Sequence, residues 1–392
     1  MSFTRCHTRR LAVATLALAC TATALFAQAP KPAAKGDYYL YAGTYTRQKS
    51  KGIYAWRFHP ADGSLQPIGL VAETSNPSFL AVAPNGRFLY AANEDSRHAG
   101  QPTGTVSAFA IDDATGKLTA LNTVVSKGAG PCHVSLDPSG KWVFVANYNT
   151  GSIASFPVRG DGSLGEAAGF VQHSGSSVNT QRQAGPHAHS VVTSPDGHFL
   201  LAADLGLDEV LVYRLGGDGS LTPNDPPFAK TAPGTGPRHM AFSHDGKFLY
   251  VVTEMIPGVT VFQYNAQRGS LSAIQTISSL PEGPIGNNSG AEIAVSPSGA
   301  FVYSSNRGDN SIAVFARDPA KGTLTAAGRF PTGGKTPRNF AIDPTGRWLF
   351  AANQDSDTIV KFRVDPKTGA LTAAGESLDV GAPVCVVFRA IK

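Results

Sequence analysis

A glycine-centred turn recurs seven times along this 392-residue chain and constrains its fold more than any other feature. The turn ends in glycine, a small residue or lysine, and leucine, as in DGSL at Asp62 and KGTL at Lys321. Its glycines are residues 63, 116, 162, 219, 269, 322 and 369, so the period is 46 to 57 residues. A recurrent period of this length is typical of a repeat architecture in which each repeat forms one supersecondary unit.

A second type of turn recurs six times, as in APNGRFLY (83–90) and DPTGRWLF (343–350). Each of these turns joins two short runs that are rich in β-branched and aromatic residues. One period therefore predicts four strands, for example RHMAFS, FLYVVT, GVTVFQY and LSAIQTI. Four antiparallel strands repeated at this spacing are typical of a β-propeller blade.

The missing seventh turn of the second type indicates how the ring closes. YYLYAGTY (38–45) has the pattern of a second strand with no first strand before it, and PVCVVF (383–388) that of a first strand with nothing after it. Pairing the two completes one blade from both ends of the chain. The sequence thus predicts an all-β fold, a single seven-bladed β-propeller over residues 38–392, closed by pairing of its N- and C-terminal strands.

The N-terminal segment, MSFTRCHTRRLAVATLALACTATALFAQAP, has arginines ahead of an apolar run and then small residues suited to cleavage. This pattern predicts an export signal peptide over 1–27, a linker over 28–37 and a periplasmic location. The pair Arg9-Arg10 leaves twin-arginine export open beside the general route. Cleavage takes the net charge from +5 to +2, because the segment holds three arginines and no acid. Nothing therefore points to nucleic acid, and no stretch of the mature chain is apolar enough to span a membrane.

The cysteines and histidines give no metal-binding pattern. Cys132 and Cys385 remain in the mature chain, and the repeat alignment places them two blades apart, so we expect free, buried thiols. No CxxC spacing occurs. His187 and His189 have an HxH spacing, but the sequence singles out no third ligand. We therefore expect neither metal nor cofactor.

Aligning the blades gathers a candidate site at one end of the central channel. The first strand of each blade lines the channel, and the turn after it brings the start of that strand beside the end of the second strand. Asn recurs at the second-strand end in four blades, which indicates a turn cap or a blade-to-blade hydrogen bond. The titratable or cationic residues that differ between blades are better functional candidates, because they converge in a concave site. They are His189, Arg238, His239, Glu254, Glu292 and Arg307.

The loop GPIGNNSG (283–290) leads over the same channel mouth to Glu292. Its glycines allow close approach of the backbone to a ligand. Asn287 and Asn288 offer hydrogen-bond donors and acceptors to a polyhydroxylated or carboxylated molecule. A long loop on a rigid rim predicts a functional role.

Over nearly its whole mature length the chain resembles the seven-bladed propeller lactonases, also called the 6-phosphogluconolactonase or cycloisomerase 2 family. The resemblance lies in YAGTYT, GPCHVSLDPSG, PHAHS, GPRHMAFS, GPIGNNSGAEI, SNRG and PRNFAIDPTG. The family includes a fungal carboxymuconate-cyclising enzyme. Its proposed site residues correspond here to His189, Arg238, Glu254 and Arg307, which the resemblance implies are catalytic.

Lactone opening suits these residue types, because it needs an activated water, stabilisation of an oxyanion and a grip on the substrate. We expect His189 or Glu254 to be the base, and Arg238 and Arg307 to hold an oxyanion or anionic group. The residues that we expect to bind substrate are His187, His239, Asn287, Asn288, Glu292 and Arg338.

The function predicted on these grounds is hydrolysis of a sugar or sugar-acid lactone by a monomer, with phosphorylation of the substrate left open. One alternative is a non-enzymatic periplasmic binding module, which would have an aromatic or apolar patch at the mouth. Another is a lactone-forming cycloisomerase.

Overall fold

The structure is a computed structural model that describes residues 1–3, 36–47, 49–284 and 286–392. Apart from residues 1–3, the predicted signal peptide lies outside the described residues. The rest is almost entirely β-structure, with a single short 3-10 helix, η1 (Gln354–Ser356), among the described residues. No described helix is long and apolar enough to cross a membrane.

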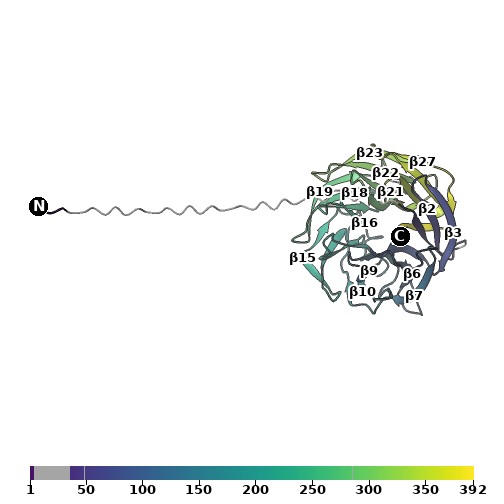
Figure 1. Cartoon of the computed structure of the whole chain (residues 1–392), viewed down its shortest axis with the longest axis horizontal. Coiled ribbons are helices and arrows are strands. Elements are labelled where there is room, and N and C mark those ends of the chain that lie inside the picture. The colour runs from purple at the N-terminus through teal and green to yellow at the C-terminus, as the bar shows by residue number, and fades with distance from the viewer. Residues whose placement is uncertain (4–35, 48, 285) are drawn as a thin grey trace. The chain divides into compact units, whose positions relative to one another are not determined.

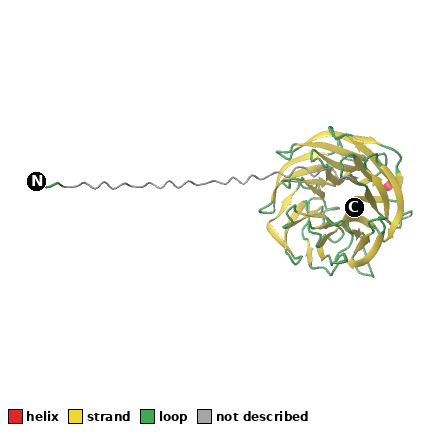
Figure 2. Ribbon diagram, viewed as in Figure 1, coloured by secondary structure: helices red, strands yellow, loops and turns green. Residues whose placement is uncertain are grey.

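Seven antiparallel sheets are arranged in a ring around a central axis (Figures 1 and 2), which confirms the predicted seven-bladed β-propeller. The first strands, which line the channel, are β29 (Pro383–Ala390), β4 (Pro77–Val82), β8 (Pro131–Leu136), β12 (Ala188–Thr193), β16 (Pro237–Phe242), β20 (Ser289–Val295) and β24 (Pro337–Ile342). The second strands are β1 (Tyr38–Thr44), β5 (Phe88–Asn93), β9 (Trp142–Asn147), β13 (Phe199–Asp204), β17 (Phe248–Thr253), β21 (Phe301–Arg307) and β25 (Trp348–Asn353).

The two outer strands of each blade complete the sheets. The third strands are β2 (Gly52–His59), β6 (Thr105–Ile111), β10 (Ser152–Pro157), β14 (Glu209–Leu215), β18 (Gly258–Asn265), β22 (Ser311–Arg317) and β26 (Thr358–Val364). The outermost strands are β3 (Ser64–Glu73), β7 (Leu118–Val125), β11 (Gly169–Gln172), β15 (Leu221–Lys230), β19 (Ser270–Ser278), β23 (Leu324–Pro331) and β27 (Leu371–Ala373). In the last blade β28 (Leu378–Asp379) also pairs with β26.

The two ends of the chain close the ring in one blade. Strand β29 pairs antiparallel with β1 from Tyr38 opposite Ala390 to Thr44 opposite Pro383. All seven residues of β1 are buried, so this pairing contributes both backbone hydrogen bonds and core packing. The predicted closure by the terminal strands is therefore confirmed, and it removes the free inner edge that an open ring would expose.

The recurrent turn glycines that define the sequence period pack against aromatic rings of neighbouring blades. A Cβ atom at Gly63 would lie 2.5 Å from the Trp348 ring, and one at Gly162 would lie 2.3 Å from the Phe88 ring. The same arrangement holds at all seven glycines, each of which has a positive φ. Both the left-handed turn and the ring contact require glycine, which explains in physical terms why this residue marks every blade.

The two thiols of the propeller lie in different parts of the ring. Cys132 is in β8 and Cys385 is in β29, with the blade β4–β7 between them. Both are buried and free, as predicted.

We expect thiol titration of denatured residues 28–392, without reductant, to find two reactive groups per chain. The blade that separates Cys132 from Cys385 keeps the two sulfur atoms out of disulfide reach. A parallel sample treated with reductant should give the same number. A higher number after reduction would contradict the blade assignment.

Candidate active site

A β-bulge at the start of every inner strand builds the channel mouth. In the pairing of β12 with β13, Ala188 lies opposite Asp204 and Ser190 opposite Ala203, so His189 has no partner residue. Corresponding register shifts occur in the other six blades. A bulge bends the strand and changes the direction of the extra side chain. The residues left out of the pairing include Cys132, His189, Arg238, His239, Glu292 and Arg338.

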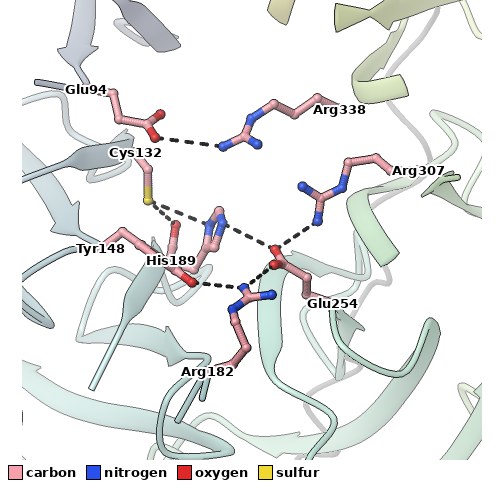
Figure 3. Close-up of a pocket in the computed structure, with 8 residues that line it drawn as sticks. All are labelled: Glu94, Cys132, Tyr148, Arg182, His189, Glu254, Arg307 and Arg338. Carbon is pink, nitrogen blue, oxygen red and sulfur yellow. Dashed lines mark hydrogen bonds and ion pairs between the residues drawn. The ribbon is translucent and has the colours of Figure 1, made fainter. Parts of the chain in front are cut away.

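The bulge residues, the ends of the second strands and the loop before β12 together enclose a pocket of about 200 Å³ (Figure 3). Eight described residues line it, and five of them carry charge. They are Glu94, Cys132, Tyr148, Arg182, His189, Glu254, Arg307 and Arg338. With a neutral histidine the lining bears three positive and two negative charges, so the pocket favours an anionic ligand or a reaction in which negative charge develops.

The carboxylate of Glu254 lies between three guanidinium groups, those of Arg182, Arg238 and Arg307. Its Oε2 is 3.0 Å from Arg238 Nε and 3.0 Å from Arg307 Nη2. Its other oxygen, Oε1, accepts a hydrogen bond of 2.7 Å from Arg182 Nη2. Figure 3 shows Arg182 and Arg307 approaching this carboxylate from different elements of the rim.

These contacts decide the charge of Glu254. Burial alone would raise its pKa, but the guanidinium groups of Arg307 and Arg238 and the hydrogen bond from Arg182 hold the pKa far below its ordinary value. Burial lowers the pKa of Arg238 to about 10, which still leaves that guanidinium charged at neutral pH. Glu254 is therefore a fixed anion that three cations share, and a weak base.

His189 lies beside Glu254 but is neutral, whereas Glu254 is charged. Its Nε2 is 3.7 Å from Glu254 Oε2, and its Nδ1 is 3.7 Å from Cys132 Sγ. Burial and the nearby charges of Arg238 and Arg338 lower the pKa of His189 well below its ordinary value. The imidazole is therefore neutral at physiological pH and keeps a nitrogen lone pair that can accept a proton.

The opposite wall of the pocket holds a second, looser ion pair. Arg338 Nη2 is 3.9 Å from Glu94 Oε1, and the Tyr45 hydroxyl donates a 2.9 Å hydrogen bond to Glu94 Oε2. The Arg338 guanidinium also lies over the Tyr45 ring, 5.4 Å from its centroid. At 3.9 Å the carboxylate does not fully occupy the guanidinium, so Arg338 has capacity to bind a ligand oxygen.

A family model described as a seven-bladed β-propeller lactonase matches residues 39–388. The chain belongs to the seven-bladed β-propeller lactonase family.

Named relatives of known sequence or structure agree with this assignment. The 6-phosphogluconolactonase of Bacillus subtilis strain 168 is 38% identical over 287 residues, which cover 73% of this chain and 80% of that protein. The 6-phosphogluconolactonase of Formosa agariphila is 34% identical over 294 residues, 74% of this chain and 82% of that one. The solved structure of the periplasmic gluconolactonase of Pseudomonas aeruginosa is 39% identical and superposes with a TM-score of 0.85, covering 91% of this chain and all of that chain (100%).

The residues predicted to be catalytic lie together at this pocket. His189, Glu254 and Arg307 line the pocket directly. Arg238 lies behind Glu254, with its Nη1 donating to the Ala291 carbonyl at 2.6 Å, and is not among the described lining residues.

The residues predicted to bind substrate are divided between four places. Arg338 lines the pocket, whereas His239 and Glu292 lie behind it, buried among other channel side chains. His187 stacks on Tyr148 with ring centroids 4.6 Å apart, at the edge of the site. On the rim loop, Asn287 is exposed and Asn288 is half-buried, and neither is among the eight described lining residues.

Sequence reasoning did not select four of the lining residues. Glu94 and Tyr148 lie at the ends of second strands in the blade alignment but are not among the predicted site residues. Cys132 was predicted only to be a buried thiol. Arg182 comes from the loop between β11 and β12, outside the aligned positions. It reaches the site because Gln183, which is fully buried, donates to the Leu205 carbonyl at 2.8 Å and fixes the loop.

The recurrent asparagines have the structural role that the alignment indicated. Asn147 Nδ2 donates to the Ser126 carbonyl at 3.0 Å, and Asn353 Nδ2 donates to the Thr332 carbonyl at 3.2 Å. Each such bond ties the end of a second strand to the segment that crosses from the preceding blade. Among described residues, no group of three or more His, Cys, Asp or Glu side chains is placed to hold a metal ion.

We expect Glu254→Gln to lower the free energy of unfolding by about 3–5 kcal/mol, because it leaves buried guanidinium groups without their anion. Chemical denaturation at pH 7 measures this loss. The pKa of Glu254 is lower in the folded protein than its ordinary value of about 4.5 in the unfolded chain. The ionised carboxylate therefore stabilises the fold fully above about pH 4.5, and this contribution declines as the pH falls below that value. The difference between variant and wild type should therefore shrink in acid.

The matched control is Glu94→Gln, which removes a carboxylate from the same pocket but from a single, longer ion pair. It should cost about 1 kcal/mol or less. Equal losses for the two variants would contradict the special position of Glu254 among the arginines.

Proposed function

We propose that this protein is a lactonase that hydrolyses a sugar or sugar-acid lactone, with His189 as the general base. The observation that carries the proposal is a neutral, buried imidazole directly beside a cationic pocket, in a chain of the propeller lactonase family. The geometry favours His189 over Glu254 as the base, because the Glu254 carboxylate already accepts from three guanidinium groups.

The reaction begins with a water molecule that donates a proton to His189 as its oxygen attacks the lactone carbonyl carbon. The carbonyl oxygen becomes an oxyanion, which Arg307 and Arg338 stabilise through charge-assisted hydrogen bonds. The tetrahedral intermediate then collapses, the bond between carbonyl carbon and ring oxygen breaks, and protonated His189 returns its proton to the ring oxygen. The product is an open-chain hydroxy acid, which loses a proton to solvent.

Arg307 is suited to bind the developing charge. Its Nη2 donates to the Gly290 carbonyl at 2.8 Å and also contacts Glu254, while its buried Nε has no hydrogen-bond partner among the described residues. An unpaired buried donor costs free energy until a ligand oxygen accepts from it. A substrate or intermediate that fills the pocket can provide that acceptor.

The polar pocket lining argues against the binding-module alternative. That alternative requires an aromatic or apolar mouth, whereas five of the eight described lining residues carry charge and Tyr148 is the only one of the eight with a phenyl ring. We also infer that the protein acts after export, because its N-terminus has the pattern of a signal peptide and one relative is named a periplasmic gluconolactonase.

A panel of aldonolactones, each with and without a phosphate group, tests the proposal. Residues 28–392 should increase the rate of base uptake in a pH-stat above spontaneous opening for at least one substrate. An unphosphorylated lactone is the expected best substrate for an exported enzyme. Background rates throughout the panel would favour the binding module.

A further inference from the structure

A chain of buried hydrogen bonds runs behind the pocket from Glu254 to the closure strand. Arg238 begins it, with Nε donating to Glu254 Oε2 at 3.0 Å and Nη1 lying 3.3 Å from His239 Nε2. Arg238 is 1% exposed and is the largest fully buried side chain among the described residues, so these contacts rather than solvent fix its guanidinium.

The contacts of His239 define which of its nitrogens carries the proton. A guanidinium group only donates hydrogen bonds, so Nε2 must be the acceptor from Arg238. The proton is then on Nδ1, which donates to Glu292 Oε1 at 3.0 Å and lies 3.1 Å from Oε2. Burial and the charge of Arg238 lower the pKa of His239 well below its ordinary value, in agreement with a neutral ring.

The Glu292 carboxylate accepts hydrogen bonds from three donors and so extends the chain of hydrogen bonds beyond His239. Its Oε1 accepts from the Ile293 backbone N–H at 2.9 Å, and its Oε2 accepts from Asn339 Nδ2. The other end of the Asn339 amide accepts from the Val386 N–H at 2.8 Å. Val386 belongs to β29, so the chain of contacts connects the Glu254 blade with the blade that closes the ring.

We propose that His239 and Glu292 are positioning residues that hold the Arg238 guanidinium against Glu254 and thereby keep the carboxylate of Glu254 aligned with His189. Neither is among the described residues that line the pocket. They act through Arg238 instead of touching substrate. This inference rests on the proposed lactonase function, since it assigns these residues to the same site.

The charge on Glu292 should make this alignment depend on pH. Burial raises the pKa of Glu292 to about 7, against the opposing effects of its hydrogen bonds. Above that pH the carboxylate accepts from His239 Nδ1–H, and Nε2 stays available to Arg238. Below that pH the Glu292 carboxyl group carries a proton, which competes with the His239 Nδ1–H donor. Turnover should therefore rise as the pH increases through about 7. The titratable and charged groups that face the Glu292–His239 pair are Arg238, His133, Cys385, Glu254, Arg307 and Arg338.

Glu292→Gln tests the pair with little change in volume. The glutamine amide has one N–H₂ group in place of an acceptor oxygen. That group must face a donor, either Asn339 Nδ2 or the pair formed by Ile293 N–H and His239 Nδ1–H. We expect kcat to fall about 10- to 100-fold with little change in KM, since a displaced Arg238 misaligns the catalytic groups. The rise of kcat near pH 7 should disappear. Wild-type kcat and an unchanged pH profile would overturn the proposal.

The double variant Glu292→Gln with Asn339→Asp is the matched rescue. The new amide at position 292 can donate to the new carboxylate, whose second oxygen accepts from Val386 N–H as the native amide does. The amide oxygen then accepts from His239 Nδ1–H and Ile293 N–H. We expect kcat to return to within about fivefold of wild type, because every hydrogen bond is restored. A double variant as slow as the single one would count against positioning.

His239 supplies a test in case the Glu292 variants fold poorly. His239→Gln retains a donor for Glu292 and an acceptor for Arg238, whereas His239→Leu retains neither. The glutamine variant should be about tenfold or more faster than the leucine variant, because it alone keeps Arg238 in place. Equal rates would overturn the proposal.

Nitrogen NMR of the protein labelled at histidine gives a readout that does not need turnover. Wild type at pH 8 should show His239 as the Nδ1–H tautomer, and Glu292→Gln should change that signal. If wild type opens no lactone, the proposed function fails while this spectrum still tests the pair. An Nε2–H tautomer for His239 would overturn the positioning proposal alone.

Discussion

Replacement of His189 by glutamine is expected to lower kcat on a good lactone substrate by about 100- to 10,000-fold, the usual contribution of general acid–base catalysis. Glutamine has a similar reach and remains neutral, but it cannot accept a proton at working pH. KM should change little, because the guanidinium groups that bind the substrate are unaffected. Initial rates across a range of substrate concentrations separate the two parameters.

Asn353→Ala is the control for this variant. Asn353 is fully buried, and its amide binds a neighbouring backbone carbonyl instead of facing the pocket. It should lower the midpoint of thermal unfolding and leave kcat near that of wild type. If His189→Gln retained wild-type kcat, His189 would not be the base and the pocket would need another one.

Deletion of residues 383–392 is expected to abolish cooperative folding. The deletion removes β29, and with it the whole partner of the buried strand β1. It also removes the Cys385 thiol, which lies 3.3 Å from the Leu80 backbone N–H, and the buried Arg389, whose Nε donates to the Gly86 carbonyl at 2.8 Å. The blade would lose its channel-lining strand, and the edge of β1 would be exposed.

A shorter deletion of residues 391–392 provides the control. It removes the hydrogen bond from Ile391 N–H to the Asp37 carbonyl but leaves β29 intact. Heat-denaturation curves should show a sharp transition for this protein and no sharp transition for the longer deletion. A sharp transition at the wild-type temperature after the longer deletion would contradict the closure of the ring by β29.

The fold could be predicted from the sequence because its physical cause repeats in the sequence. Each blade needs a left-handed turn that packs on an aromatic ring, and only glycine meets both conditions, as at Gly63 and Trp348. The closure followed from counting, since one turn was missing and one strand was left over at each end of the chain. The strand pairing of Tyr38 with Ala390 confirms that count.

The candidate site could be predicted only in part, because strand alignment locates a backbone position and not the direction of a side chain. It placed Glu292 and His239 at the channel mouth, but the bulge in β20 and β16 allows Glu292 to turn toward His239, behind the pocket. The blade alignment did not identify Arg182, because this residue belongs to a loop with no counterpart in the other repeats. Its ion pair with Glu254 spans 72 residues of sequence, and no local pattern encodes such a contact.

The route of oxygen into the product tests the central claim most directly. We propose that water attacks the lactone carbonyl and that the bond to the ring oxygen breaks. The reaction is run in oxygen-18 water with enough enzyme that enzymatic opening is much faster than spontaneous opening. The label should then appear in the carboxylate of the hydroxy acid and not in its hydroxyl groups. Label in a hydroxyl group, or ring opening without label, would contradict attack of water at the carbonyl in this pocket.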